Sequence, residues 1–278
     1  MIQKNSWRNR SSFGDRFFWF SLAVIISTYI TFLVALLFAS SFHTSSSSIL
    51  RLFSQSEIRY ALRLSLLSST VSTLLSLWIA VPSGYYLARC SSPLLKLIEV
   101  IMDIPLILPP LVVGMLLLIL FQTPPGRWLQ SHIPVTYAIP SIIIAQGVIG
   151  TAYAVRMMKD AFASLDQREE KVAQTLGCTA SQAFWYIAFP AAKRGIFSAA
   201  ILTWARCFGE FGPILVFSGA TRLKTEVLPT SIYLEMSIGN LENALAVSFL
   251  MIGVAVLLLL AFRLWGESAS IHKPGTAI

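Results

Sequence analysis

Two charged residues lie inside an otherwise apolar stretch of this chain, at residues 196–217. Arg206 and Glu210 are four positions apart there, so a helix would place their side chains on one face, close enough to pair. Pairing reduces the cost of at least ~2.5 kcal/mol that a lone charge meets near the centre of a bilayer. The pair therefore has two interpretations: it faces a pathway and tunes it for an anion, or it packs this segment against neighbouring helices.

The same stretch holds three residues that weaken a helix, Gly209, Gly212 and Pro213. Non-helical backbone at membrane depth is tolerated only against protein or a water-filled cavity. We expect a break here, either lining a pathway or forming a packing kink. Small polar faces in two other stretches have the same two interpretations, helix packing or a hydrated route. Their residues are Ser65, Ser69, Ser72 and Ser76 in one stretch, and Gln146, Gly147, Gly150 and Thr151 in the other.

Sequence signatures of catalysis are missing. No G-x-x-x-x-G-K-[ST] loop, HExxH or nucleophile elbow occurs in the chain. The three cysteines are isolated and the three histidines lie far apart, which disfavours a disulfide framework and a metal site. We predict that the chain is not an enzyme and binds no cofactor. If ATP drives its activity, the ATPase is a separate polypeptide.

Composition places these residues in a membrane protein. Of the 278 residues, 55% are apolar and 12% are charged, about half the charged fraction of a soluble domain. The mean hydropathy is +0.70, and several apolar runs exceed the ~18 residues that indicate a span. The net charge of +8 comes from basic residues at the ends of these runs, not from a stripe with interleaved aromatics. A nucleic-acid partner is therefore disfavoured, and the lipid bilayer is the expected surrounding.

The sequence predicts an all-α chain with six transmembrane helices. The first resembles a signal peptide, but it is too long and no clear cleavage site follows, which favours an uncleaved helix. The transmembrane domain covers 17–265, between a tail at 1–16 and a tail at 266–278. The predicted spans are 17–39, 64–88, 104–121, 138–158, 196–217 and 243–262.

Charge placement predicts the orientation. With the N-terminus in the cytoplasm, 14 basic residues lie inside and 6 outside, so the positive-inside rule favours cytoplasmic location of both termini. The stretch 159–195 between the fourth and fifth spans is then cytoplasmic. It is the most charged region of the chain and has helical character, which indicates a docking surface for another protein rather than a plain solvated loop.

A motif in this loop carries the first family resemblance. Glu170 precedes Lys171-Val172-Ala173, and Gly177 follows; nine residues later come Ile187 and Pro190. This resembles the EAA loop of ATP-binding-cassette (ABC) importer permeases, E-A-A-x3-G-x9-I-x-L-P, with the acid one position early and Phe189 in place of leucine. Ala173 and Gly177 are expected on one helical face that another surface can approach. Gly177 is expected to end the first short helix as a left-handed cap, and Pro190 to end the second.

A second resemblance concerns the substrate. The stretch after residue 204 is similar to permeases for tetrahedral oxyanions, which share A-R-x-x-G-E-F-G, T-x-x-L-P-x-x-I-Y and G-x-L-x-x-A. A D-x-P-x-x-x-P-P run in the third span is similar to the molybdate branch. The matching residues are Ala205, Arg206, Gly209, Glu210, Phe211, Gly212, Thr225, Leu228, Pro229, Ile232, Tyr233, Gly239, Leu241 and Ala244, with Asp103, Pro105, Pro109 and Pro110 in the third span.

These resemblances imply the type I ABC importer (MetI-like) permease fold. They also imply a homodimer, two ABC ATPase subunits that hold ATP and Mg²⁺, and a periplasmic or extracellular substrate-binding protein. The coupling loop would be 159–195, in the plasma (inner) membrane of a prokaryote. The implied cargo is molybdate or tungstate, with sulfate or thiosulfate as the alternative. A rival from another class is an ATP-independent secondary transporter, which would leave the 159–195 loop unexplained.

Overall fold

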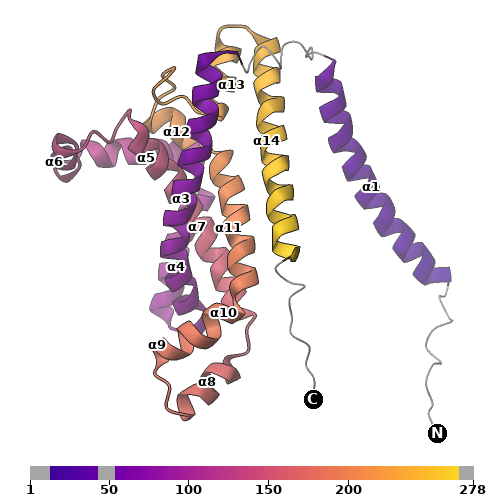
Figure 1. Ribbon diagram of the computed structural model, residues 1–278, viewed down its shortest axis with the longest axis vertical. Helices are drawn as coiled ribbons and strands as arrows, with labels where there is room; N and C mark the ends of the chain where they lie inside the picture. Colours follow the sequence, from indigo (N-terminus) through magenta and orange to yellow (C-terminus); the bar gives the residue numbers. More distant parts are fainter. Residues whose placement is uncertain (1–12, 43–53, 269–278) are drawn as a thin grey trace.

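The computed structural model describes residues 13–42 and 54–268, and every regular element in these ranges is helical (Figure 1). The all-α prediction is confirmed for this part of the chain. Most of the predicted N-terminal tail and of the C-terminal tail lies outside the described residues. Helix α1 (Phe13–Ser41) begins inside the predicted N-terminal tail, at Phe13.

Four described helices are long and apolar enough to cross a membrane. They are α1, α3 (Ser56–Arg89), α7 (Ile139–Ala163) and α14 (Leu241–Ser268). They correspond to the first, second, fourth and sixth predicted spans. The largest difference in boundary is in α3, which starts at Ser56 instead of residue 64 and adds two turns at that end.

The third predicted span is not a continuous helix. It divides into α4 (Pro93–Ile107) and α5 (Pro110–Gln122), which are bent by 109° at the break. Pro109 and Pro110 lack the N–H groups that would continue the ladder, and Leu108 and Pro109 take extended ψ angles of 142° and 134°. The bent pair gives up to five candidate spans by length and composition. Helix α6 (Pro124–His132) follows α5 directly.

The fifth predicted span is also interrupted, as its glycines indicated. Helix α11 (Lys193–Phe208) ends before Gly209, and α12 (Gly212–Phe217) begins after residue 211. Helix α13 (Leu228–Ser237) then leads into α14. Neither α11 nor α12 alone has the length of a span, so the predicted fifth span is a broken segment.

Helices α3, α7 and α11 form the centre of the bundle, with the backbones of α3 and α7 close together. A Cβ added at Gly84 of α3 would lie 2.5 Å from the Cβ of Met158 on α7. A glycine is required at this crossing, since any side chain would push the two helices apart. The same approach recurs between α11 and α7, where a Cβ on Gly195 would lie 2.5 Å from the Cβ of Ala161.

The short helices lie at the two ends of this bundle. Helix α13 lies at one end, and α8 (Gln167–Thr175), α9 (Ala180–Ala183) and α10 (Phe189–Ala191) lie at the other (Figure 1). The π-helical segment η1 (Phe184–Ala188) joins α9 to α10. The 159–195 loop is therefore a folded subdomain at one end of the bundle.

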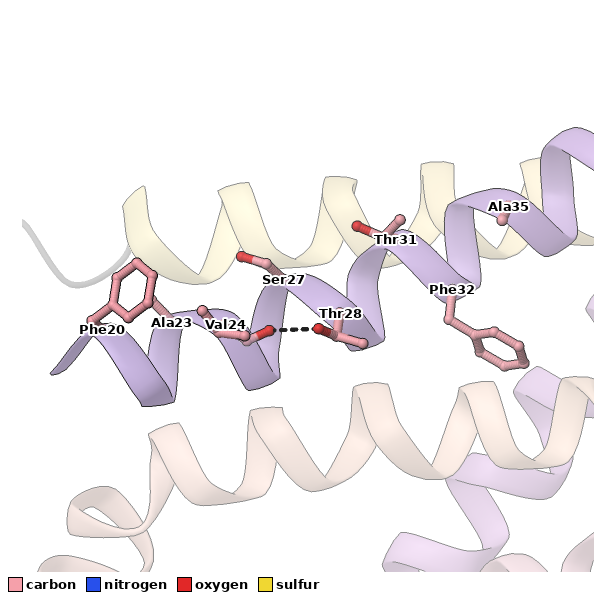
Figure 2. Close-up of a pocket in the computed structure, with 8 residues that line it drawn as sticks. All are labelled: Phe20, Ala23, Val24, Ser27, Thr28, Thr31, Phe32 and Ala35. Atoms are coloured by element: carbon pink, nitrogen blue, oxygen red, sulfur yellow. Dashed lines mark hydrogen bonds between the residues drawn. The ribbon is translucent and has the colours of Figure 1, made fainter. Parts of the chain in front are cut away.

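Helix α1 stands apart from the bundle, beyond α14 (Figure 1), and the most apolar part of its candidate span has no buried residue. A hollow of about 540 Å³ lies along it, lined by eight residues that all belong to α1 (Figure 2). The Thr28 hydroxyl in this hollow donates to the Val24 carbonyl of the same helix, at 2.8 Å. The hollow is thus one face of a single helix.

Candidate functional site: the 159–195 loop and the break after α11

The first helix of the loop is capped at both ends by its own sequence. Asp166 accepts a hydrogen bond from the Arg168 amide at 2.9 Å and caps the start of α8. At the other end Gly177 has a φ of +96°. The Gly177 amide donates to the Gln174 carbonyl at 3.1 Å, and the Cys178 amide donates to the Ala173 carbonyl at 3.0 Å. This is a Schellman motif, and it confirms the left-handed cap predicted at Gly177.

The second helix starts with a capping box, in which Thr179 and Gln182 bond each other's backbone at 3.2 and 2.8 Å. The prediction that Pro190 ends this helix is wrong, because the helical path continues to Ala191. The π-helical segment η1, whose turns are wider than those of an α-helix, ends at Ala188, two residues before Pro190. A wide turn of this kind is one way a helix tolerates a ring that lacks an N–H. Ile187 is half-buried in η1, and Pro190 is exposed.

Glu170 is turned toward the bundle rather than toward solvent. Its side chain is only 7% exposed and pairs with Arg89, the last residue of α3. One carboxylate oxygen accepts from the Arg89 Nη2 and Nε at 2.5 and 3.0 Å, and the other accepts from the Tyr85 hydroxyl at 2.7 Å. Arg89 also donates through Nη1 to the Phe162 carbonyl, at 2.9 Å.

Ala173 is likewise buried against the bundle, whereas Gly177 is exposed. The expectation that these two residues share a face open to another surface is therefore wrong. Helix α8 ends at Thr175, and the left-handed turn rotates Gly177 away from the inward face. The rings of Tyr85, Phe162 and Phe184 pack together as an aromatic cluster, with centroids 4.7 to 6.2 Å apart.

The exposed residues of the loop include large apolar side chains beside charged ones such as Lys171. We call the loop face the four residues Val172, Leu176, Trp185 and Tyr186, whose exposed fractions are 57%, 81%, 58% and 77%. Val172 on α8 and Leu176, its C-cap residue, are four positions apart, which places them on one side of this helix. Large apolar side chains with this exposure at a charged end of a bundle are typical of a protein interaction site.

The break after α11 brings its two charged residues together as predicted. Arg206 on the last turn of α11 pairs through Nη1 with Glu210 Oε2. Glu210 is 2% exposed, while the Arg206 side chain is 38% exposed. The guanidinium therefore lies at the accessible edge of the pair, and the carboxylate lies inside the fold.

Gly212 and Pro213 in the break pack tightly on α5. A Cβ at Gly212 would lie 2.8 Å from the Pro110 Cβ, and one at Gly114 would lie 2.8 Å from the Pro213 Cα. Gly209 is different, because a Cβ there would meet nothing closer than 3.6 Å. The contacts of Gly212 and Pro213 are thus those of a packing kink, whereas a Cβ at Gly209 would make only ordinary contacts.

The polar faces predicted on the second and fourth spans meet each other. Ser65, Ser69, Ser72 and Ser76 are all buried at 0–1% exposure. The Ser72 hydroxyl donates to Gln146 Oε1 at 3.1 Å, and the Gln146 Nε2 donates to the Cys207 carbonyl at 3.1 Å. These bonds tie α3, α7 and α11 together at the centre of the bundle, which supports the helix-packing interpretation.

Several buried polar residues were not singled out from the sequence. Glu226 is 1% exposed and its Oε2 has no hydrogen-bond partner. Burial raises the pKa of Glu226 from its ordinary value of 4.5. Nearby in sequence, Arg222 pairs with Glu235 at 2.7 Å. The T-x-x-L-P run that surrounds Glu226 was the available signal. Among the described residues, no group of three or more His, Cys, Asp or Glu side chains could hold a metal ion.

The chain resembles known proteins in both sequence and fold. Residues 80–266 match the family described as the binding-protein-dependent transport system inner membrane component. The chain is 32% identical over 203 residues to the molybdenum transport system permease protein ModB of Mycobacterium tuberculosis, covering 72% of this chain and 76% of that protein. It is 37% identical over 156 residues to the molybdate/tungstate transport system permease protein WtpB of Pyrococcus abyssi, covering 56% and 59%.

A solved structure extends the likeness across nearly the whole fold. One chain of a bacterial alginate ABC transporter, solved in complex with an alginate-bound periplasmic protein, superposes with a TM-score of 0.72. The identity is 18%, and the match covers 93% of this chain and 96% of that one. The MetI-like type I importer permease fold predicted from the loop motif is confirmed. The match to the family model spans most of the described bundle, and the chain belongs to the family of binding-protein-dependent transport system inner membrane components.

Proposed function

We propose that this protein is the permease subunit of an ATP-driven importer for a tetrahedral oxyanion, molybdate or tungstate, with sulfate as the alternative cargo. The observation that carries this proposal is the folded 159–195 loop. Its left-handed turn at Gly177 and its loop face give a folded projection with four exposed apolar side chains at one end of the bundle. The likeness to ModB and WtpB supports the choice of molybdate or tungstate.

The partners follow from the same features. Two ABC ATPase subunits would receive the loop face of two permease copies, and a substrate-binding protein would dock at the opposite end, near α13. ATP and Mg²⁺, held by the ATPase subunits, supply the energy. Both chain termini lie in the cytoplasm in this arrangement, because the positive-inside bias places the 159–195 loop there.

The roles of this chain's residues can be stated from their contacts. Val172, Leu176, Trp185 and Tyr186 bury apolar area against the ATPase. Gly177 fixes the angle between α8 and α9. The loop is continuous with α7 and α11, so its displacement moves both helices, and α11 ends at the break at Gly209. Arg206, at the accessible edge of its pair, offers a positive group to a dianion there.

The competing class is a secondary transporter, which needs no ATPase. The loop face discriminates between the two, because an ATP-independent carrier has no use for a projecting apolar surface at the cytoplasmic end.

The test is uptake by proteoliposomes that hold the permease, the ATPase and the binding protein, supplied in turn with molybdate, tungstate and sulfate. We expect ATP-dependent uptake of molybdate or tungstate. Uptake of sulfate alone would make sulfate the cargo in place of molybdate or tungstate. Uptake that does not need ATP would favour the secondary transporter. Co-purification of the ATPase with the permease, measured alongside, tests the loop face directly.

A further inference from the structure

We propose that Arg89 is a positioning residue for energy coupling: its ion pair with Glu170 is the link through which the 159–195 loop drives α3. This inference rests on the proposed function. The loop is attached covalently to α7 and α11 only, and α3 lies some 80 residues away in sequence, Glu170 and Arg89 being 81 positions apart. Without a non-covalent link, displacement of the loop would reach α3 only through side-chain packing.

The geometry of this link is that of a rigid joint. Arg89 contacts one Glu170 oxygen through two nitrogens, and Tyr85, one turn earlier on α3, contacts the other. Both carboxylate oxygens are therefore held from α3. The Arg89 and Glu170 side chains are 12% and 7% exposed, so water screens the pair only weakly. An exposed ion pair contributes little and exchanges readily; this one is buried and bonded through several atoms.

The link also reaches α7. The Arg89 Nη1 donates to the Phe162 carbonyl in the last turn of α7, and the Phe162 ring is 5.3 Å from the Tyr85 ring. One and a half turns before Arg89, Gly84 brings the α3 backbone against Met158 of α7. The ends of α3 and α7 and the start of α8 are thus held together at one point, and we infer that they move as one body during transport.

Another ion pair at this end differs in kind. Arg156 on α7 and Asp103 on α4 lie 3.8 Å apart, with side chains 66% and 29% exposed. This pair connects two helices without touching the loop. Arg156 therefore offers a matched control: the same residue type, at the same end of the bundle, in a salt bridge that the proposal does not use.

The experiment uses the complete complex in proteoliposomes and measures anion imported per ATP hydrolysed, with ATPase co-purification as a second readout. Arg89→Gln should keep the ATPase bound, because the loop face is unchanged, but lower the transport-to-hydrolysis ratio at least tenfold. Arg156→Gln should leave that ratio within about twofold of the unmodified complex. A purely structural role for Arg89 would lower abundance and ATPase binding without changing the ratio in the complexes that remain.

Charge exchange keeps the proposal testable if Arg89→Gln proves unstable. The double variant Arg89→Glu with Glu170→Arg restores a pair of opposite charges, so it should recover a substantial part of the ratio that either single reversal loses.

A second test joins the two positions covalently. Arg89→Cys and Glu170→Cys are combined in a background where Cys90 and Cys178 are serine, and the two thiols are bridged by a short thiol-specific linker. If the joint stays closed through the cycle, the bridged complex should retain ATP-driven uptake.

Each result has a defined consequence. Normal coupling by Arg89→Gln, or loss of uptake on bridging, would overturn the inference while leaving the importer assignment in place. Failure of the unmodified complex to import any of the three anions with ATP would instead overturn the proposed function.

Discussion

Gly177→Val tests the coupling role of the loop most directly. The backbone at Gly177 has a φ of +96°, in the region that residues with a Cβ avoid, and a β-branched residue there is a genuine outlier. A Cβ would meet no atom within 4 Å, so no clash adds to the conformational cost. That cost is ~1–2 kcal/mol, which changes an equilibrium roughly 5- to 30-fold.

A free-energy cost of this size is too small to unfold a membrane bundle, but all of it acts on the single turn that joins α8 to α9. The two hydrogen bonds that close the turn, from the Gly177 and Cys178 amides, set the angle between α8 and α9. We therefore expect normal abundance in the membrane, and either loss of the bound ATPase or hydrolysis no longer linked to uptake. The measurements are membrane abundance, ATPase co-purification and anion uptake per ATP.

Gly239 provides a closely matched control. Its φ is +78°, a Cβ there would also meet nothing within 4 Å, and it ends α13 with the same pair of bonds, from the Gly239 amide to Met236 and from the Asn240 amide to Glu235. It lies at the other end of the bundle (Figure 1). Gly239→Val should thus carry a similar strain and still co-purify with the ATPase. Full ATP-driven uptake by the Gly177→Val protein would refute the coupling role of this loop.

Further substitutions test the broken segment and the buried acid. Arg206→Gln leaves Glu210 buried and unpaired and should cost about 3–5 kcal/mol; the detergent-purified protein should unfold at a lower temperature, and adding Glu210→Gln should restore it. Gly212→Ala pushes against Pro110 and should lower stability by roughly 1–3 kcal/mol, whereas Gly209→Ala, whose added Cβ makes only ordinary contacts, should unfold at the unmodified temperature. The raised pKa of Glu226 means that the folded protein binds this proton more tightly than the unfolded chain, so stability is complete below the ordinary value of 4.5 and is lost as pH rises through the folded value. Glu226→Gln should remove that loss, seen as a smaller fall in unfolding temperature as the pH rises above 4.5; an unchanged pH profile would contradict this assignment.

The features that were predictable from sequence are those set by neighbouring residues. The left-handed turn at Gly177 follows from a glycine placed after a short polar helix, and the break near Gly209 follows from a cluster of helix-weakening residues. The bend at Pro109 was missed, because prolines at a helix start and prolines at a sharp bend have the same local pattern. The packing of α12 on α5, as at Gly114 against Pro213, shows that α5 turns to meet α12.

The features that were not predictable depend on partners far away in the chain. The regular spacing of the serines on α3 was visible in the sequence. Their role depended on finding Gln146 opposite Ser72, 74 positions away. Glu170 was expected to belong to the loop's coupling surface, and it is instead held by Arg89. No spacing rule within the loop could indicate this, since an acid on a short polar helix has the same pattern whether it faces solvent or its own bundle.

The polar bonds of α3 connect the two ends of the molecule. At one end Arg89 holds the 159–195 loop through Glu170. At the other, the Leu228 amide donates to the Ser65 hydroxyl at 2.8 Å, and the Tyr60 hydroxyl donates to the Lys224 carbonyl at 3.1 Å. Helix α3 therefore bonds both the loop proposed to meet the ATPase and the segment before α13 at the far end. Because its 34 residues form one unbroken helix, a shift of α3 along its axis displaces both attachments together. An importer that couples ATP hydrolysis at one end to release of the anion from the binding protein at the other needs a rigid element with such attachments.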